Sequence, residues 1–198
     1  MNYEVFNLFP VLVMRFPNFL DDAKCDILDN KYRNSEIMKQ HHYFTNDALC
    51  SHTPDLNLVA EISESMEDFK DFNKRIDDTL LEYSKITGFR PTCVSNSWFN
   101  IQRRGSALFD HMHPLSFVSG CLYLSFPEGS NNIFFWNPSS TPAYIPRTEE
   151  TIYSSETYWV KPAKGELVLF PGWIKHGSNG YENNSDNRSS IAFNSSVY

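Results

Sequence analysis

The sequence lacks the features that define several classes of protein. It has only 8 glycines and 11 prolines in 198 residues, too few for a collagen-like or low-complexity chain. It also lacks a long hydrophobic run: the longest, residues 115–126, is interrupted by Ser116, Ser119 and Gly120, and a membrane span needs about twenty apolar residues. The aromatic content, by contrast, is high, with 16 Phe, 10 Tyr and 4 Trp, which excludes a disordered chain. The sequence therefore predicts a folded globular protein with a sizeable core.

Cysteine is scarce as well, and no two of the four cysteines form a Cys-x-x-Cys pair. Their wide, irregular spacing favours reduced, buried thiols over a disulfide framework; they are Cys25, Cys50, Cys93 and Cys121. An export signal is also missing, because Glu4 stands where basic residues are expected and Arg15 interrupts the apolar stretch that follows. We therefore expect a cytoplasmic protein, in the host cytoplasm if the chain is viral, with no membrane partner.

Basic residues are fewer than acidic ones, 17 against 24. The formal net charge is −7: residues 1–90 carry 16 acidic and 10 basic side chains, and residues 91–198 carry 8 and 7. A protein that binds phosphates usually displays a basic stripe, and neither part of the sequence has one. The charge thus argues against nucleic acid as a partner.

Residues 1–90 are predicted to form a mainly helical support region. Apolar residues three or four apart run through residues 53–88 as one stripe, typical of one or two helices packed on a sheet. The stripe consists of Leu58, Ile62, Met66, Phe69, Phe72, Ile76, Leu80 and Tyr83. Thr53-Pro54-Asp55 supplies an N-terminal cap signal and Gly88 a stop signal. Another helix is expected over about residues 20–32, after a short extended pair at 3–6 and 11–16.

Residues 91–198 consist of short runs rich in aromatic and β-branched residues. Such runs, separated by Gly, Pro, Asn and Ser, are typical of a sandwich or small barrel. The expected strands are 93–102, 108–111, 117–126, 133–136, 157–160, 166–170 and 189–194. Because no internal repeat or long linker is visible, we expect one α+β domain over residues 1–198, with the helices packed against the β part.

Three of the six histidines fall within two compact motifs. In the first, residues 109–114, His111 and His113 would point to the same face of an extended strand and could converge on a metal ion; the alternative is a pair of packed or surface histidines. In the second, residues 165–176, an apolar strand ends in Pro171-Gly172 and leads to His176. A jelly-roll arrangement would return His176 beside the first pair.

Arg188 opens the last predicted strand. Arg188, Ser190 and Ala192 would share one face of it. An arginine that points into a barrel is a costly buried charge unless it meets an anion. A bound carboxylate is the natural partner, because the guanidinium group pairs with it bidentately; the alternative is a surface arginine on an edge strand.

Taken in order, these motifs resemble the superfamily of 2-oxoglutarate- and iron(II)-dependent dioxygenases, with the closest likeness to phage and marine bacterial members that carry a His-x-His-Pro motif. The matching segments are 98–100, 111–114, 119–124, 169–176 and 188–194, which together span about half of the chain.

The resemblance implies a double-stranded β-helix, or jelly roll, with the N-terminal helices packed against its major sheet. It implies Fe(II) and 2-oxoglutarate as cofactors, with Arg188, Tyr123, Ser190 and Asn100 as candidate cosubstrate-binding residues. The implied reaction consumes O2, releases succinate and CO2, and hydroxylates a peptidyl or small-molecule substrate.

One position departs from the superfamily pattern, in which two histidines and one carboxylate hold the metal. His113 stands where the usual aspartate would be. Either His111, His113 and His176 hold the metal together, which we favour, or a carboxylate such as Asp110 takes part after a bulge re-aims it.

Two other functions stay open on the sequence. A cupin-type metal dioxygenase or isomerase would have the same architecture, and Gly105 precedes the histidine pair at the cupin spacing, but Phe117 and Val118 stand where the cupin glutamate is expected. A non-catalytic jelly-roll module could instead bind a sugar or peptide through its aromatic residues. Arg188 separates the first alternative from the 2-oxoglutarate enzymes, and metal content separates the second.

The sequence says least about the identity of the substrate. Residues 137–157 are expected to form a loop between strands, with Glu149, Glu150 and Glu156 in it. In this superfamily such loops often recognise the substrate, so the three acids favour a basic or neutral target; an ordinary solvated loop is the alternative.

Overall fold

The helical part of the computed structural model follows the apolar stripe. The structure describes residues 1–46, 48–139 and 145–197. Helix α1 spans Asp22–Arg33, α2 spans Leu58–Ser65, and α3 spans Phe72–Thr87, with a short 3-10 helix, η1, at Glu67–Phe69 between the last two. α3 is followed by the predicted stop residue Gly88, whose φ of 73° gives the left-handed C-cap that glycine favours. None of the helices among the described residues is long and apolar enough to cross a membrane.

The start of α2 differs from the prediction. Its N-cap is Asn57, whose side chain accepts a hydrogen bond from the Ala60 backbone N–H at 3.2 Å, and not the segment Thr53-Pro54-Asp55. α1 begins at Asp22, close to the predicted start at about residue 20, and its N-cap is Asp21, whose side chain accepts a hydrogen bond from the backbone N–H of Lys24 at 2.8 Å.

The β part confirms most of the predicted strands. They are β4 (Thr92–Gln102), β5 (Val118–Ser125), β6 (Ile133–Trp136), β7 (Thr157–Val160), β8 (Leu167–Pro171) and β10 (Arg188–Val197). Three short strands come in addition, β2 (Lys39–Gln40), β3 (Ala48–Cys50) and β9 (His176–Gly177).

Two predicted strands are wrong. Residues 3–6 form no strand, and the N-terminal strand β1 is limited to Met14–Phe16, where it pairs with β8. Residues 108–111 form only single bridges, Leu108 with Phe44 and His111 with His176, because this segment passes from one neighbour to another and never runs alongside one partner.

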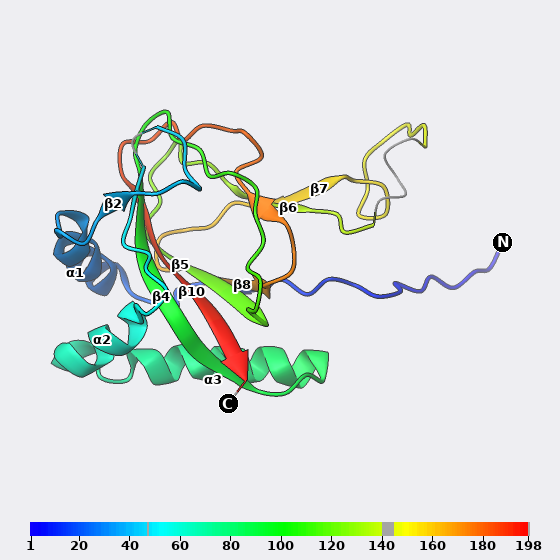
Figure 1. Cartoon of the computed structure of the whole chain (residues 1–198). Coiled ribbons are helices and arrows are strands. Elements are labelled where there is room, and N and C mark those ends of the chain that lie inside the picture. Colours follow the sequence, from blue (N-terminus) through cyan, green and yellow to red (C-terminus); the bar gives the residue numbers. More distant parts are fainter. Residues whose placement is uncertain (47, 140–144, 198) are drawn as a thin grey trace.

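The strands form two sheets. The major sheet has seven strands in the order β1-β8-β5-β10-β4-β3-β2, and the minor sheet has three in the order β7-β6-β9. Figure 1 shows α3 lying along the major sheet, α1 and α2 beside it, and the minor sheet on the opposite side. This is the two-sheet arrangement of a jelly roll with helices on its major sheet.

The alternation of side chains along β5 connects two cores. Leu122 and Leu124 point to the helix side and pack with residues such as Leu28 of α1 and Ile76 of α3. Tyr123 points the other way, into the space between the sheets. Complete burial of each aliphatic side chain on the helix side stabilises the fold by roughly 2 kcal/mol. The helices thus support the major sheet from outside and leave its inner face free to build a site.

The cysteines are free, as predicted, but only two are fully buried. Cys25 and Cys50 are buried, whereas Cys93 and Cys121 are partly accessible.

Candidate functional site

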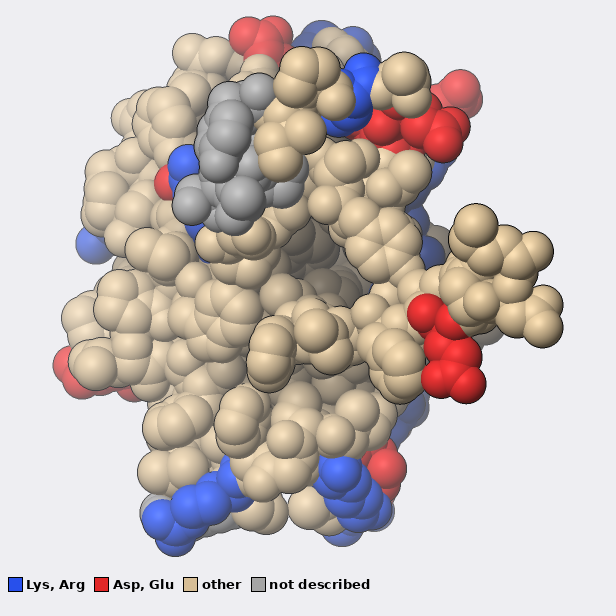
Figure 2. Space-filling view, turned by 90° about the vertical axis from the view of Figure 1, so that its right-hand side faces the viewer, with Lys and Arg blue, Asp and Glu red and all other residues tan. Residues whose placement is uncertain are grey.

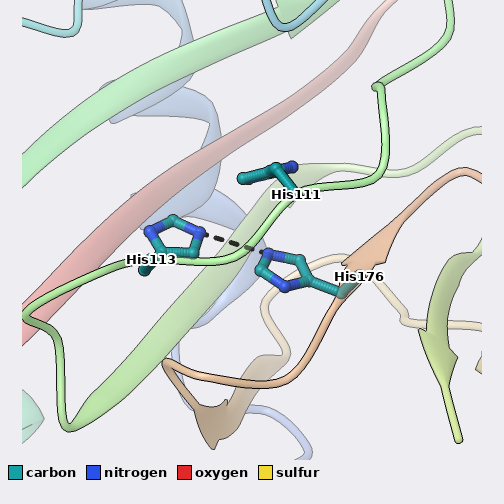
Figure 3. A group of neighbouring side chains, drawn as sticks. All are labelled: His111, His113 and His176. Atoms are coloured by element: carbon teal, nitrogen blue, oxygen red, sulfur yellow. Dashed lines mark hydrogen bonds between the residues drawn. The ribbon is translucent and has the colours of Figure 1, made fainter. Parts of the chain in front are cut away.

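Three histidines converge between the two sheets. One nitrogen each of His111, His113 and His176 lies within 4.8 Å of the other two, and the Nε2 atoms of His113 and His176 are 3.2 Å apart. Figure 3 shows the three imidazoles pointing toward one another, two from the segment before β5 and one from β9. Three imidazole nitrogens at this spacing could hold a transition-metal ion.

Backbone contacts set the positions and orientations of these rings. His111 and His176 exchange two backbone hydrogen bonds, at 2.8 and 2.9 Å, which bring the two motifs together. The Nδ1 of His111 lies 2.8 Å from the Phe109 carbonyl oxygen, and the Nδ1 of His176 lies 2.9 Å from that of Ile174. An Nδ1–H that donates to a carbonyl leaves the Nε2 lone pair free to bind a metal.

Burial keeps the three imidazoles neutral. Loss of solvent lowers the pKa of His113 to about 3, lowers the pKa of His176 well below its ordinary value, and lowers that of His111 as well. A neutral imidazole is the form that binds a metal ion.

Asp110 lies outside this group. Its Oδ1 accepts a hydrogen bond from the Asn179 backbone N–H at 3.3 Å, and it packs against Gly177, where a Cβ would lie 2.4 Å from that oxygen. Asp110 is therefore engaged with the turn after β9 and is not among the ligand atoms that converge.

A cavity of about 250 Å³ joins the histidines to the other predicted site residues. Its lining includes all seven of them: His111, His113, His176, Asn100, Tyr123, Arg188 and Ser190. Figure 2 shows a hollow in one face of the molecule with a mostly uncharged rim. Among the described residues that line the cavity, Arg188 is the sole lysine or arginine, and none is an aspartate or glutamate.

Arg188 is a buried cation without a carboxylate partner in the described part of the chain. It is 7% exposed, donates a hydrogen bond from Nη1 to the Gln102 side-chain oxygen, and lies 5.2 Å from the Tyr123 ring centroid. Its Nε is buried and makes no hydrogen bond. A buried guanidinium without a carboxylate partner is energetically costly, and an anion bound in the cavity would offset this cost.

The sequence did not predict several residues of the cavity wall. His41 and His52, which belong to no motif, line the same cavity. Tyr43 stacks on His111 with ring centroids 4.9 Å apart, and His52 meets the edge of Trp98 at 4.6 Å. No local sequence signal places these residues, because long-range contacts position their segment.

The prediction also left out Gln102 as a cavity residue, although a pattern in the sequence indicates it. On β4 it lies two residues beyond Asn100 and four beyond Trp98, and all three line the cavity. The period of two along a strand was sufficient to identify it.

The predicted substrate loop does not bring free carboxylates to the cavity. Arg147 donates to Glu150 at 2.9 Å and to Glu156 at 3.4 Å, and none of Glu149, Glu150 and Glu156 lines the cavity. Part of the predicted loop, residues 140–144, lies outside the described residues.

Known structures share this fold. A Pseudomonas putida prolyl-4-hydroxylase superposes with a TM-score of 0.62 at 14% identity, covering 94% of this chain and 93% of that chain. HygX from Streptomyces hygroscopicus, solved with nickel and 2-oxoglutarate, gives 0.63 at 13% identity, covering 94% and 83%. The viral collagen prolyl hydroxylase vCPH from Paramecium Bursaria Chlorella virus-1, solved as a 2-oxoglutarate complex, gives 0.57 at 12% identity, covering 93% and 96%. These similarities confirm the predicted α+β jelly roll.

The sequence comparisons identify the family. No curated protein matches the sequence. The family described as "Putative 2OG-Fe(II) oxygenase" matches residues 96–194, which is half of the chain and includes both histidine motifs and Arg188. The chain therefore belongs to this family of 2OG-Fe(II) oxygenases, enzymes whose cofactors are Fe(II) and 2-oxoglutarate.

Proposed function

We propose that this oxygenase hydroxylates its substrate with release of succinate and CO2, and that His111, His113 and His176 hold the iron. The observation that carries the proposal is Arg188, a buried guanidinium without a carboxylate partner in the described chain, in the same cavity as the three convergent imidazoles. A metal cluster alone would fit many enzymes, but a metal cluster beside an unpaired arginine fits a keto acid with a second carboxylate.

The residues present fit both cofactors. Three neutral imidazoles with converging nitrogens suit Fe(II). When bound, Fe(II) would supply the redox chemistry that couples O2 to the oxidative decarboxylation of 2-oxoglutarate and to the oxidation of the substrate. Arg188 would pair with the distal carboxylate, and Tyr123 and Ser190 would donate hydrogen bonds to it. Asn100, whose buried Oδ1 has no hydrogen-bond partner, would complete the cosubstrate pocket.

Membership of the oxygenase family argues against the two alternatives. A cupin that does not use 2-oxoglutarate would have no need of Arg188, and a non-catalytic module would have no need of three converging imidazoles. We also propose that the chain is similar to phage and marine bacterial members of the family, which the His-x-His-Pro motif at residues 111–114 supports.

For the substrate, we propose a peptidyl group or a small molecule that is not bound through its positive charge. The acidic loop residues favoured a basic or neutral target, but Glu150 and Glu156 pair with Arg147. Among the described residues, no carboxylate lines the cavity. Of the two expected kinds of substrate, basic and neutral, the cavity therefore favours a neutral one.

An anaerobic titration with Fe(II) and 2-oxoglutarate tests the proposed function. Direct chelation of iron by the keto acid gives a visible charge-transfer band, which we expect in the parent protein, not in His176→Ala, and only weakly in Arg188→Ala. Succinate formed without substrate, after O2 is admitted to the same samples, provides a second measurement. Absence of both the band and succinate in the parent protein would contradict the proposal.

A further inference from the structure

Gln102 is positioned to orient the guanidinium group of Arg188. It is the last residue of β4, is 1% exposed, and lies directly opposite Arg188 in the register of β10. Its side-chain oxygen accepts a hydrogen bond from Arg188 Nη1. Because a guanidinium group has only donors, this contact fixes which end of the amide faces the arginine.

The other end of the amide has no hydrogen-bond partner. The Nε2 of Gln102 is buried and makes no hydrogen bond, as is also true of Arg188 Nε. Both residues line the cavity. Two adjacent buried donors without acceptors indicate a ligand that supplies acceptor atoms.

The backbone around Gln102 is held firmly. Its carbonyl oxygen accepts a hydrogen bond from Asn183 Nδ2 at 2.9 Å, and Asn183 is itself fully buried. On the other side, Gln102 pairs with Ala48 of β3. The amide therefore belongs to a rigid part of the sheet and can fix the direction of the guanidinium.

The neutrality of the amide matters as much as its position. A carboxylate in this place would also accept from Arg188, but it would form a buried ion pair and compensate the positive charge. An amide orients the guanidinium group and leaves its charge available to an incoming anion.

We propose that Gln102 completes the binding site for the distal carboxylate of 2-oxoglutarate: its oxygen positions Arg188, and its free N–H donates to the carboxylate. This inference rests on the proposed function of the site. It identifies Gln102 as a cosubstrate-binding residue that selects keto acids with a second carboxylate.

The test compares two keto acids in three variants. 2-Oxoglutarate and pyruvate chelate a metal through the same keto-carboxylate group, but pyruvate lacks the distal carboxylate. Dissociation constants are measured anaerobically from the Fe(II) charge-transfer band in the parent protein, Gln102→Glu and Gln102→Leu. Gln40→Glu, an exposed position on β2, makes the same chemical change away from the cavity.

We expect Gln102→Glu to weaken 2-oxoglutarate binding by about tenfold or more, because hydrogen bonds to charged groups are strong and the new ion pair occupies Arg188. Gln102→Leu should weaken it in the same direction, and pyruvate binding should be unchanged in both variants. Gln40→Glu should match the parent protein with both keto acids. Thermal melting identifies a variant that does not fold. If Gln102→Glu does not fold, the dissociation constants of Gln102→Leu provide the test.

Two results would overturn the inference. One is unchanged 2-oxoglutarate binding in a folded Gln102 variant, and the other is an equal loss for pyruvate, which would indicate a purely structural role. Failure of the proposed function is distinguishable, because the parent protein itself would then show no band with either keto acid.

Discussion

At the residue scale, the unusual feature of the proposed metal site is that all three of its ligands would be neutral. In the proposed site His113 would take the place of the usual carboxylate, so Fe(II) held by His111, His113 and His176 would keep its full charge of +2. Compared with a site that has a carboxylate ligand, such a metal would attract the dianion 2-oxoglutarate more strongly. Without 2-oxoglutarate, the three neutral ligands would hold the metal less firmly than a set that includes a carboxylate.

Replacing His113 tests this electrostatic coupling. Addition of 2-oxoglutarate raises the iron affinity by some factor in the parent protein. In His113→Asp this factor should be smaller by about tenfold or more, because the new carboxylate repels the cosubstrate. His113→Asn, which has nearly the same size and no charge, is the matched control and should keep the larger gain. Anaerobic metal titration against a chelator gives the constants. If the parent protein shows no gain with 2-oxoglutarate, the three-histidine hypothesis loses its support.

The histidines also predict how the metal-free protein responds to pH. Their pKa values are lowered by burial, to about 3 for His113. As the pH falls below about 6.5, the unfolded chain takes up protons that the folded state cannot, so the free energy of unfolding falls with pH from about 6.5 toward 3. Each imidazole that stays neutral in the folded state contributes a slope of at most about 1.4 kcal/mol per pH unit in this range.

Urea unfolding of the metal-free protein at pH 7.5 and pH 5 measures this loss. A variant in which His111, His113 and His176 are all replaced by glutamine should show a flatter dependence on pH. The same steep dependence in that variant would show that other groups are responsible.

What the sequence predicted at this scale followed from short-range geometry. The two-residue spacing of His111 and His113, and of Arg188 and Ser190, identified side chains that line one cavity. His52 and Tyr43 had no such signal, since their segment is placed by contacts across the chain, such as the hydrogen bond from Phe109 N to the Tyr43 carbonyl oxygen at 2.8 Å.

At the element scale, a polar network joins α1 to the strand that carries Arg188. Asp29 of α1 accepts a hydrogen bond from Ser189 of β10 at 2.6 Å and pairs with Arg33, which in turn donates to Asn187 at 2.6 Å. Asp29 is only 9% exposed. Because Ser189 directly follows Arg188, the network fixes the start of β10.

Removal of the Asp29 charge should destabilise the fold. We expect Asp29→Asn to lower the free energy of unfolding by about 1 to 3 kcal/mol, since the half-buried Arg33 loses its partner. Asp78→Asn, which breaks the exposed pair between Lys74 and Asp78 on α3, makes the same chemical change and should have no measurable effect. Urea unfolding of both variants gives the comparison, and equal effects would contradict a special role for the network.

The strands illustrate which elements a sequence can predict. β6 and β7 lie where short runs rich in aromatic and β-branched residues predicted them. Residues 108–111 have the composition of a strand, but a strand needs a continuous partner, and this segment has only isolated bridges. β9 is two residues long and exists because His176 pairs with Phe135, a contact that no local pattern indicates.

At the scale of the whole molecule, the acidic helical part and the nearly neutral β part share one core. Buried residues of all three α-helices pack with residues of β4, β5 and β10 in a single cluster that includes Leu28, Ile62, Ile76, Phe99 and Ile191. The difference in charge between residues 1–90 and 91–198 therefore marks two layers of the molecule. We propose that these layers fold as one unit, because separating them would expose the helix-facing side of the major sheet.

Two spectroscopic signals can test this proposal separately for each layer. All four tryptophans, Trp98, Trp136, Trp159 and Trp173, lie in residues 91–198, whereas the α-helices lie within residues 22–87. Tryptophan fluorescence thus reports the β layer and far-UV circular dichroism at the helix band reports the helical layer. If the core is shared, both signals should change at the same urea concentration with the same slope. Two separated transitions would show that the layers fold independently, and a fragment of residues 91–198 that unfolds cooperatively by itself would lead to the same conclusion.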